Sequence, residues 1–234
     1  MTAALPVSPL AGLPPRFLAG LVLALVAGSA FLLAAPLTDD GVRVALKGSG
    51  VALLALAALQ LPVPGARWLA AIMALGAMGD VLLDIKFLAG AISFAAAHLV
   101  GISFYAQHRR AGADRLVPGL ILAWGLIMPF ALIPVGDDLW PALIYALLLT
   151  LMAASLWCSR FPRLAALGAL AFIASDTLLV LRLGGGALLG GSADGALVWI
   201  LYFGGQWLIT LGVGRGLLAR ARSSPHASLV PSSA

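Results

Sequence analysis

Long runs of apolar residues follow one another along the chain, separated by short groups of charged residues, proline and glycine. A transmembrane helix needs about 20 consecutive, predominantly apolar residues, and the interruptions leave about eight segments of that length. These lie near residues 17–35, 42–61, 67–85, 88–107, 116–134, 139–159, 163–183 and 195–216. The sequence therefore predicts an all-α, polytopic membrane protein, with one transmembrane helical domain over residues 1–222 and a disordered polar tail over 223–234.

Composition supports membrane insertion. The chain is 62% hydrophobic and only 10% charged, with a mean hydropathy of +1.07, which excludes an ordinary soluble globular domain. In a chain this apolar, the net charge of +5 is first a topology signal, and we expect no nucleic-acid partner. The single cysteine, Cys158, excludes an internal disulfide and a cysteine-rich metal cluster.

Charged residues alternate in sign from one connection to the next. Arginines gather at the termini and the even-numbered connections: Arg16, Arg67, Arg109, Arg110, Arg115, Arg160, Arg163, Arg215, Arg220 and Arg222. The odd-numbered connections carry Asp39, Asp40, Asp84, Asp137, Asp138 and Asp194, with Lys86 and Arg182 as exceptions to the pattern. The positive-inside rule then predicts that both termini are cytoplasmic, and we expect the inner membrane of a bacterium.

Two of the predicted helices resemble each other. "RWLAAIMALGAMGDVLLDIK" from Arg67 and "RLAALGALAFIASDTLLVLR" from Arg163 align at an offset of 96 residues, which matches Asp80 with Asp176. "PLTDD" and "PVGDD" lie upstream of them at a nearly equal offset. This repetition suggests two four-helix halves with the same orientation in the membrane.

The matched pair, Asp80 and Asp176, should lie within the membrane. Each follows a cytoplasmic-side arginine by 13 residues, which places it about 20 Å into a core about 30 Å thick. An aspartate at mid-span costs roughly 2.5–3.5 kcal/mol and is usually functional, so both should face polar partners inside the protein. A polar clamp between helices is the structural alternative.

Other predicted helices bring polar residues to the same level. The candidates for substrate binding are Lys47, Asp84, His98, Tyr145, Tyr202 and Gln206. Each also has a structural interpretation, because a lysine near a helix end can extend to the interface and tyrosine or glutamine can join helices. Only one of the three histidines lies in a predicted span, so we expect no metal site and no cofactor.

The order of four motifs resembles a known family. "GDVLLD", "FLAGAISFAAAHLVGISFY", "GALAFIASDTLLVL" and "YFGGQWLI" follow one another as in the YhhN-like membrane proteins, the lysoplasmalogenase family. Lys47 also resembles the lysine of the family's second span, although Gly48 stands where relatives often have proline. The resemblance covers roughly residues 47–211.

The resemblance implies hydrolysis of the vinyl ether bond of lysoplasmalogens, which gives a fatty aldehyde and glycerophosphoethanolamine or glycerophosphocholine. Such a reaction needs one protonated carboxyl group and a second, ionised one, and Asp80 and Asp176 fit these catalytic roles without assigning which is the acid. The other polar residues would orient water or bind the headgroup, and the lysophospholipid would come from the bilayer. The alternative is a proton-coupled membrane transporter of a small or lipidic substrate, and the oligomeric state stays open.

Overall fold

The structure, a computed structural model, describes residues 12–34, 37–134, 136 and 139–223. Its helices are α1 (Pro15–Ala34), α2 (Asp40–Leu59), α3 (Ala66–Ile85), α4 (Phe87–Ala106), α5 (Leu116–Leu132), α6 (Leu139–Cys158), α7 (Arg163–Leu183) and α8 (Gly191–Ser223). Within the described residues the only extended pairing is an isolated bridge between Arg109 and Ser159. The predicted all-α fold is confirmed, whereas the predicted disordered tail lies outside the described residues, apart from Ser223 at the end of α8.

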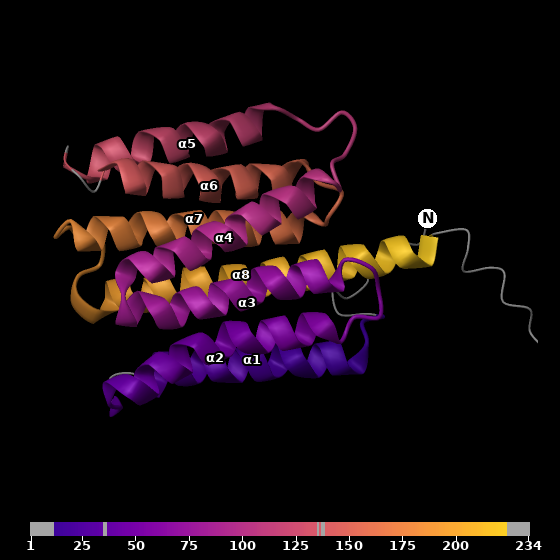
Figure 1. Ribbon diagram of the computed structural model, residues 1–234, viewed down its shortest axis with the longest axis horizontal. Helices are drawn as coiled ribbons and strands as arrows, with labels where there is room; N and C mark the ends of the chain where they lie inside the picture. Colours follow the sequence, from indigo (N-terminus) through magenta and orange to yellow (C-terminus); the bar gives the residue numbers. More distant parts are fainter. Residues whose placement is uncertain (1–11, 35–36, 135, 137–138, 224–234) are drawn as a thin grey trace, which may run out of the picture.

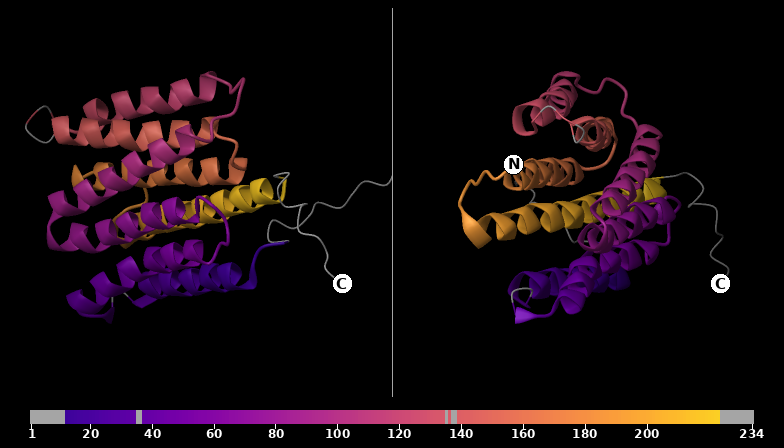
Figure 2. Two further views of the ribbon diagram at one scale, coloured as in Figure 1. Left: turned by 45° about the vertical axis from the view of Figure 1, so that its right-hand side comes forward. Right: turned by 60° about the vertical axis from the view of Figure 1, so that its left-hand side comes forward.

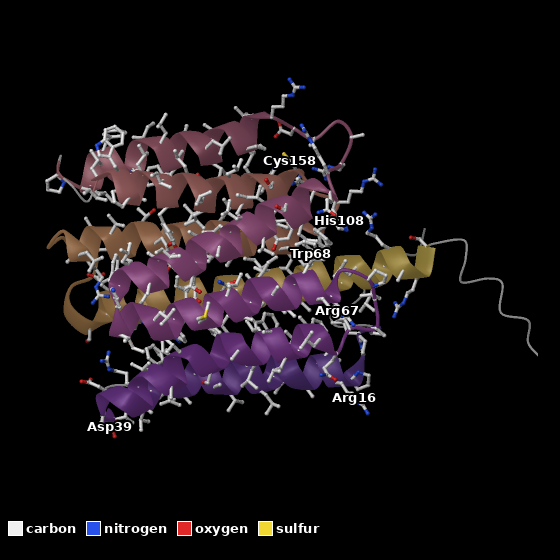
Figure 3. All side chains as sticks on the ribbon, in the orientation of Figure 1. Arg16, Asp39, Arg67, Trp68, His108 and Cys158 are labelled. Atoms are coloured by element: carbon white, nitrogen blue, oxygen red, sulfur yellow. The ribbon has the colours of Figure 1, made fainter. Side chains whose placement is uncertain are left out.

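The helices run up and down beside one another (Figure 1). Asp39 lies at one end of the bundle, and Arg16, Arg67 and His108 lie at the opposite end (Figure 3). The α3 and α8 helices are in the middle, and the turned views in Figure 2 keep α1 and α2 on one side of them and α5 and α6 on the other. We call the two ends of the bundle the aspartate end and the arginine end.

Seven of the helices are long and apolar enough to cross a membrane. The other predicted span corresponds to α5, which has 17 residues, contains Pro129 and ends in extended backbone at Ile133, just before Pro134. A helix of that length is about 25 Å long, at the short limit for a span. Large apolar side chains face outward along the bundle, as at Val22, which is 58% exposed. The chain is an integral membrane protein.

Local interactions fix the helix ends. The Asp39 side chain accepts a hydrogen bond of 2.9 Å from the Val42 N–H at the start of α2, as an N-cap does. Gly65 takes a left-handed backbone with φ of 93° just before α3. At α8, the Asp194 carboxylate accepts hydrogen bonds from the N–H groups of residues 188, 189 and 190, so this helix starts earlier than the predicted residue 195. It also continues beyond residue 216, to Ser223.

The contacts between the two halves are partly reciprocal. The last helix of each half packs on the second helix of the other, α4 on α6 and α8 on α2. The α7 and α8 backbones approach closely at Gly168, where an added Cβ would lie only 2.5 Å from the Gly205 carbonyl oxygen. Small residues of this kind let helix backbones approach in membranes. This close contact positions α7 and α8, which carry the candidate residues Asp176, Tyr202 and Gln206.

Candidate functional site

Asp80 is buried between α3 and α8. Its side chain is 2% exposed, and the Tyr202 hydroxyl donates a hydrogen bond of 2.8 Å to Oδ2. Gln206, one turn further along α8, contacts the Tyr202 hydroxyl through its side chain. Beside Asp80, Gly79 lets the Phe94 ring pack against α3, since a Cβ there would lie 2.7 Å from the ring.

Asp176 has a matching arrangement between α7 and α6. The Tyr145 hydroxyl donates a hydrogen bond of 2.9 Å to its Oδ2. The Asp176 side chain is only partly buried. On either side of it, Ser175 donates to the Val198 carbonyl of α8 at 2.9 Å, and Thr177 accepts from Trp124 of α5 at 3.1 Å. Each membrane-embedded aspartate thus receives a hydrogen bond from a tyrosine of another helix.

Aromatic rings join the two Tyr–Asp pairs into one site. The Phe172 ring centroid lies 5.0 Å from that of Tyr202 and 5.5 Å from that of His98, and His98 lies 5.5 Å from Tyr145. The four rings thus form a continuous wall from Tyr202, beside Asp80, to Tyr145, beside Asp176.

His98 is buried at the centre of this wall. It is 2% exposed, and its Nε2 atom has no hydrogen-bond partner within the described part of the chain. A buried ring nitrogen without a partner is unusual, because leaving it unpaired costs free energy. A water molecule or a polar group of a ligand would satisfy this nitrogen.

Lys47 and Asp84 lie toward the aspartate end, next to this site. Lys47 Nζ is 2.7 Å from Asp84 Oδ1, and Arg43 Nη1 is 3.9 Å from Asp84 Oδ2. Both Lys47 and Asp84 also interact electrostatically with Asp80. Among the described residues, the ion pair that Lys47 makes is with Asp84 and not with Asp80 or Asp176.

Sequence reasoning missed Arg43 and Phe172 as members of this neighbourhood. Arg43 lies three residues after Asp40 and forms a 2.9 Å ion pair with it, so its spacing alone indicates a local surface pair. Phe172 is an ordinary apolar residue by sequence, and the four-residue separation from Asp176 was the only available signal. All the predicted candidates lie on the helices where they were expected.

The arrangement can support acid–base chemistry. It offers two carboxyl groups, two phenols and an imidazole among apolar side chains. Two cations, Lys47 and Arg43, lie next to it beside Asp84. Among the described residues, His, Cys and Asp side chains do not gather in threes as metal ligands would. Two carboxyl groups held in different surroundings are the arrangement that lets one donate a proton while the other accepts one.

Comparison with known proteins places the chain in a family. No curated protein and no solved structure matches it. The profile of the YhhN family matches residues 42–213, which run from α2 into α8 and include both aspartates, both tyrosines, His98, Gln206 and the Lys47–Asp84 pair. The chain belongs to the YhhN family.

Proposed function

We propose that the protein is a lysoplasmalogenase-like hydrolase, which cleaves the vinyl ether bond of lysoplasmalogens to a fatty aldehyde and glycerophosphoethanolamine or glycerophosphocholine. The observation that carries the proposal is the pair of Tyr–Asp hydrogen bonds, Tyr202 to Asp80 and Tyr145 to Asp176. They hold two carboxyl groups that a continuous wall of ring contacts connects. Membership of the YhhN family is consistent with this activity.

The reaction proceeds in three steps, which these two carboxyl groups share. In the first, the protonated carboxyl group gives its proton to the β-carbon of the vinyl ether, and an oxocarbenium ion forms that the other, ionised carboxylate stabilises. In the second, water adds to the cationic carbon and its proton passes to that carboxylate. The hemiacetal then collapses to the aldehyde: its hydroxyl proton returns to the first carboxyl group, the bond to the glycerol oxygen breaks, and that oxygen takes the proton held by the second carboxyl group. The division of roles follows paired-carboxylate hydrolases.

Lys47 and Arg43, the two cations beside Asp84, are suited to bind the phosphate of the substrate's headgroup. Asp84 follows Asp80 by one turn of α3 toward the aspartate end, a rise of about 6 Å. In a lysoplasmalogen the glycerol backbone separates the vinyl ether from the phosphate by a comparable length. Lys47 and Arg43 would bind the phosphate, and the Asp84 carboxylate, which they now contact, would bind the ammonium group of the headgroup.

The alkenyl chain would arrive between α6 and α7. The α7 helix packs less closely on α6 than on α8. Polar side-chain contacts on this side of α7 include Trp124 of α5 with Thr177 and Tyr145 of α6 with Asp176. Asp176, on this side, is partly exposed. A lysolipid can therefore slide its chain between these helices from the bilayer and bring its vinyl ether to Asp176.

The test is aldehyde release from lysoplasmenylethanolamine by the purified protein. We expect Asp80→Asn and Asp176→Asn each to abolish turnover while the protein keeps its helix content and elution volume. Asp114→Asn is the matched control, because Asp114 accepts a hydrogen bond from the Leu116 N–H at the start of α5 and lies in the α4–α5 connection, at the arginine end. Full activity in both site variants would overturn the paired-carboxylate mechanism.

Two further measurements distinguish headgroup binding and transport from hydrolysis of the vinyl ether. Lys47→Ala should raise KM more than it lowers kcat, because the lysine contacts the headgroup and not the reacting carbon. If the wild-type protein releases no aldehyde but moves protons in response to the lysolipid in sealed liposomes, the protein is a transporter and the hydrolase proposal is wrong.

A further inference from the structure

A hollow lined by four arginines opens at the arginine end of the bundle, far from the aspartate end. Its volume is about 660 Å³, and its lining consists of Arg109, Arg110, Arg115 and Arg160 with the small residues 111–113 of the α4–α5 connection. Neither the proposed reaction nor the candidate functional site uses these residues.

Main-chain hydrogen bonds build this hollow from two separate connections. The Arg110 N–H donates to the Cys158 carbonyl at 2.9 Å, and the Arg160 N–H donates to the His108 carbonyl at 2.8 Å. Arg160 Nε also donates to the Arg109 carbonyl at 3.2 Å. The α4–α5 and α6–α7 connections are thereby tied side by side, which brings Arg109, Arg110 and Arg160 around one opening although they come from distant parts of the chain.

The arginines of this hollow form no ion pair with any described residue. In the described ranges, none of its four arginines has a carboxylate oxygen within 4.0 Å; the ion pairs there all involve Asp40 or Asp84. The nearest acid in sequence, Asp114, caps the start of α5. Four arginines around one opening, with no carboxylate in ion-pair contact among the described residues, favour an anion, and guanidinium pairs particularly well with phosphate.

The topology rule for membrane proteins explains why arginines gather at this end, but it does not explain the hollow. Arg16 and Arg67 lie at the same end (Figure 3), and both are exposed, yet neither lines it. The connections that carry Arg109 and Arg160 are instead joined by the hydrogen bonds described above. The fold therefore groups the four arginines around one opening, in addition to the topology rule that locates arginines at this end of the bundle.

The surroundings favour a lipid over a free anion. Leu116 follows Arg115 directly and is 69% exposed, and Leu120, one turn further along α5, is 60% exposed. In a membrane these side chains face acyl chains. A phospholipid whose phosphate occupies the hollow would thus lay its acyl chains along the outward face of α5.

We propose that this hollow binds the headgroup of an anionic phospholipid, such as phosphatidylglycerol, in the membrane leaflet at the arginine end. The lipid would join α4, α5, α6 and α7 at their arginine ends. This binding is independent of catalysis, so it can be present in a protein that is not a hydrolase.

The experiment compares lipid binding by the full-length protein in neutral detergent micelles. Phosphatidylglycerol or phosphatidylcholine is added in equal amounts, retained lipid is counted by native mass spectrometry, and the melting temperature is measured. We expect phosphatidylglycerol, but not phosphatidylcholine, to remain bound and to raise Tm by about 2–4 °C. The double variant Arg109→Gln, Arg110→Gln should bind phosphatidylglycerol at least about tenfold more weakly.

That variant removes no described side-chain hydrogen bond, because Arg109 and Arg110 contribute to the bridge through main-chain atoms. The matched control is Arg16→Gln, Arg67→Gln, which removes the same charge from the same end and should bind as the wild type does. Equal retention of both lipids, or an equal loss in the control variant, would contradict the proposal. So would an equal rise in Tm with inorganic phosphate at the same phosphate concentration, which would make the site one for free anions.

Discussion

The candidate site depends on two individual hydrogen bonds, each from a tyrosine to an aspartate on a neighbouring helix. A hydrogen bond to a charged group is worth about 1.5–3 kcal/mol. In the proposed mechanism a carboxylate is ionised when it stabilises the oxocarbenium ion, so a phenol that donates to it stabilises the reactive arrangement. The tyrosines are positioning residues in this scheme, and their loss should weaken catalysis without removing it.

We therefore expect Tyr202→Phe and Tyr145→Phe each to lower the rate of aldehyde release by about 10- to 100-fold. Tyr105→Phe is the matched control: this tyrosine is also buried on a membrane helix, but its hydroxyl has no hydrogen-bond partner in the described structure and lies outside the site. Activity should be unchanged in that variant. If Tyr145→Phe and Tyr202→Phe keep wild-type kcat, the Tyr–Asp hydrogen bonds have no part in the chemistry.

The sequence identified these residues but not their pairing. The depth of Asp80 and Asp176 followed from counting residues after an arginine, and Tyr145 and Tyr202 were expected at the same level on their own helices. Which tyrosine faces which aspartate depends on the rotation and tilt of each helix, and Tyr202 and Asp80 are separated by 122 residues. For the same reason Lys47 could be placed near the aspartates, whereas its ion pair with Asp84 could not be predicted.

At the scale of helices, the α7–α8 contact holds the site together. Carbonyl oxygens and backbone nitrogens meet there through Gly168, Gly205 and Gly212, and a Cβ at Gly212 would lie 2.7 Å from the Ala165 nitrogen. Because backbone atoms cannot move aside as a flexible side chain can, an added methyl group must push the helices apart. Ser175 and Tyr202, which join α7 to α8 and α8 to α3, would shift with them.

We expect Gly205→Ala to destabilise the protein by about 1–3 kcal/mol, as overpacking of a closely packed core does. The adjacent Gly204→Ala is a stringent control, because a Cβ at Gly204 meets no atom within 4 Å and alanine favours the helix. Thermal unfolding of both variants in one detergent checks the difference. Equal melting temperatures would mean that α7 and α8 are not packed through their backbones.

Helix positions were the most predictable part of the fold. Charges, prolines and glycines mark the ends of the apolar runs, so most predicted spans agree with the helices to within two residues. The exception is α8, whose ends are set by interactions that hydropathy does not reveal. Asp194 binds three consecutive N–H groups before it, and the helix continues through the polar residues up to Ser223, beyond the apolar run.

For the whole molecule, the alternation of aspartate and arginine connections becomes a separation in space, with Asp39 at one end and Arg16, Arg67 and His108 at the other (Figure 3). Positive charge is retained on the cytoplasmic side during insertion. The arginine end, with its four-arginine hollow, should therefore face the cytoplasm. The Lys47–Asp84 pair and the proposed headgroup site should then lie toward the outer side of the membrane.

Cysteine labelling in intact bacterial cells tests this orientation. In a Cys158→Ala background, Leu37→Cys should react with a membrane-impermeant maleimide before the cells are opened, because Leu37 is 86% exposed beside the aspartate end. Ala111→Cys, exposed in the α4–α5 connection, should react only after the cells are opened. The reverse pattern would invert the topology, and the four-arginine hollow would then meet lipids of the outer leaflet. Labelling of both cysteines in intact cells would mean that the bundle inserts in two orientations, and the arginine bias would not be sufficient to fix one.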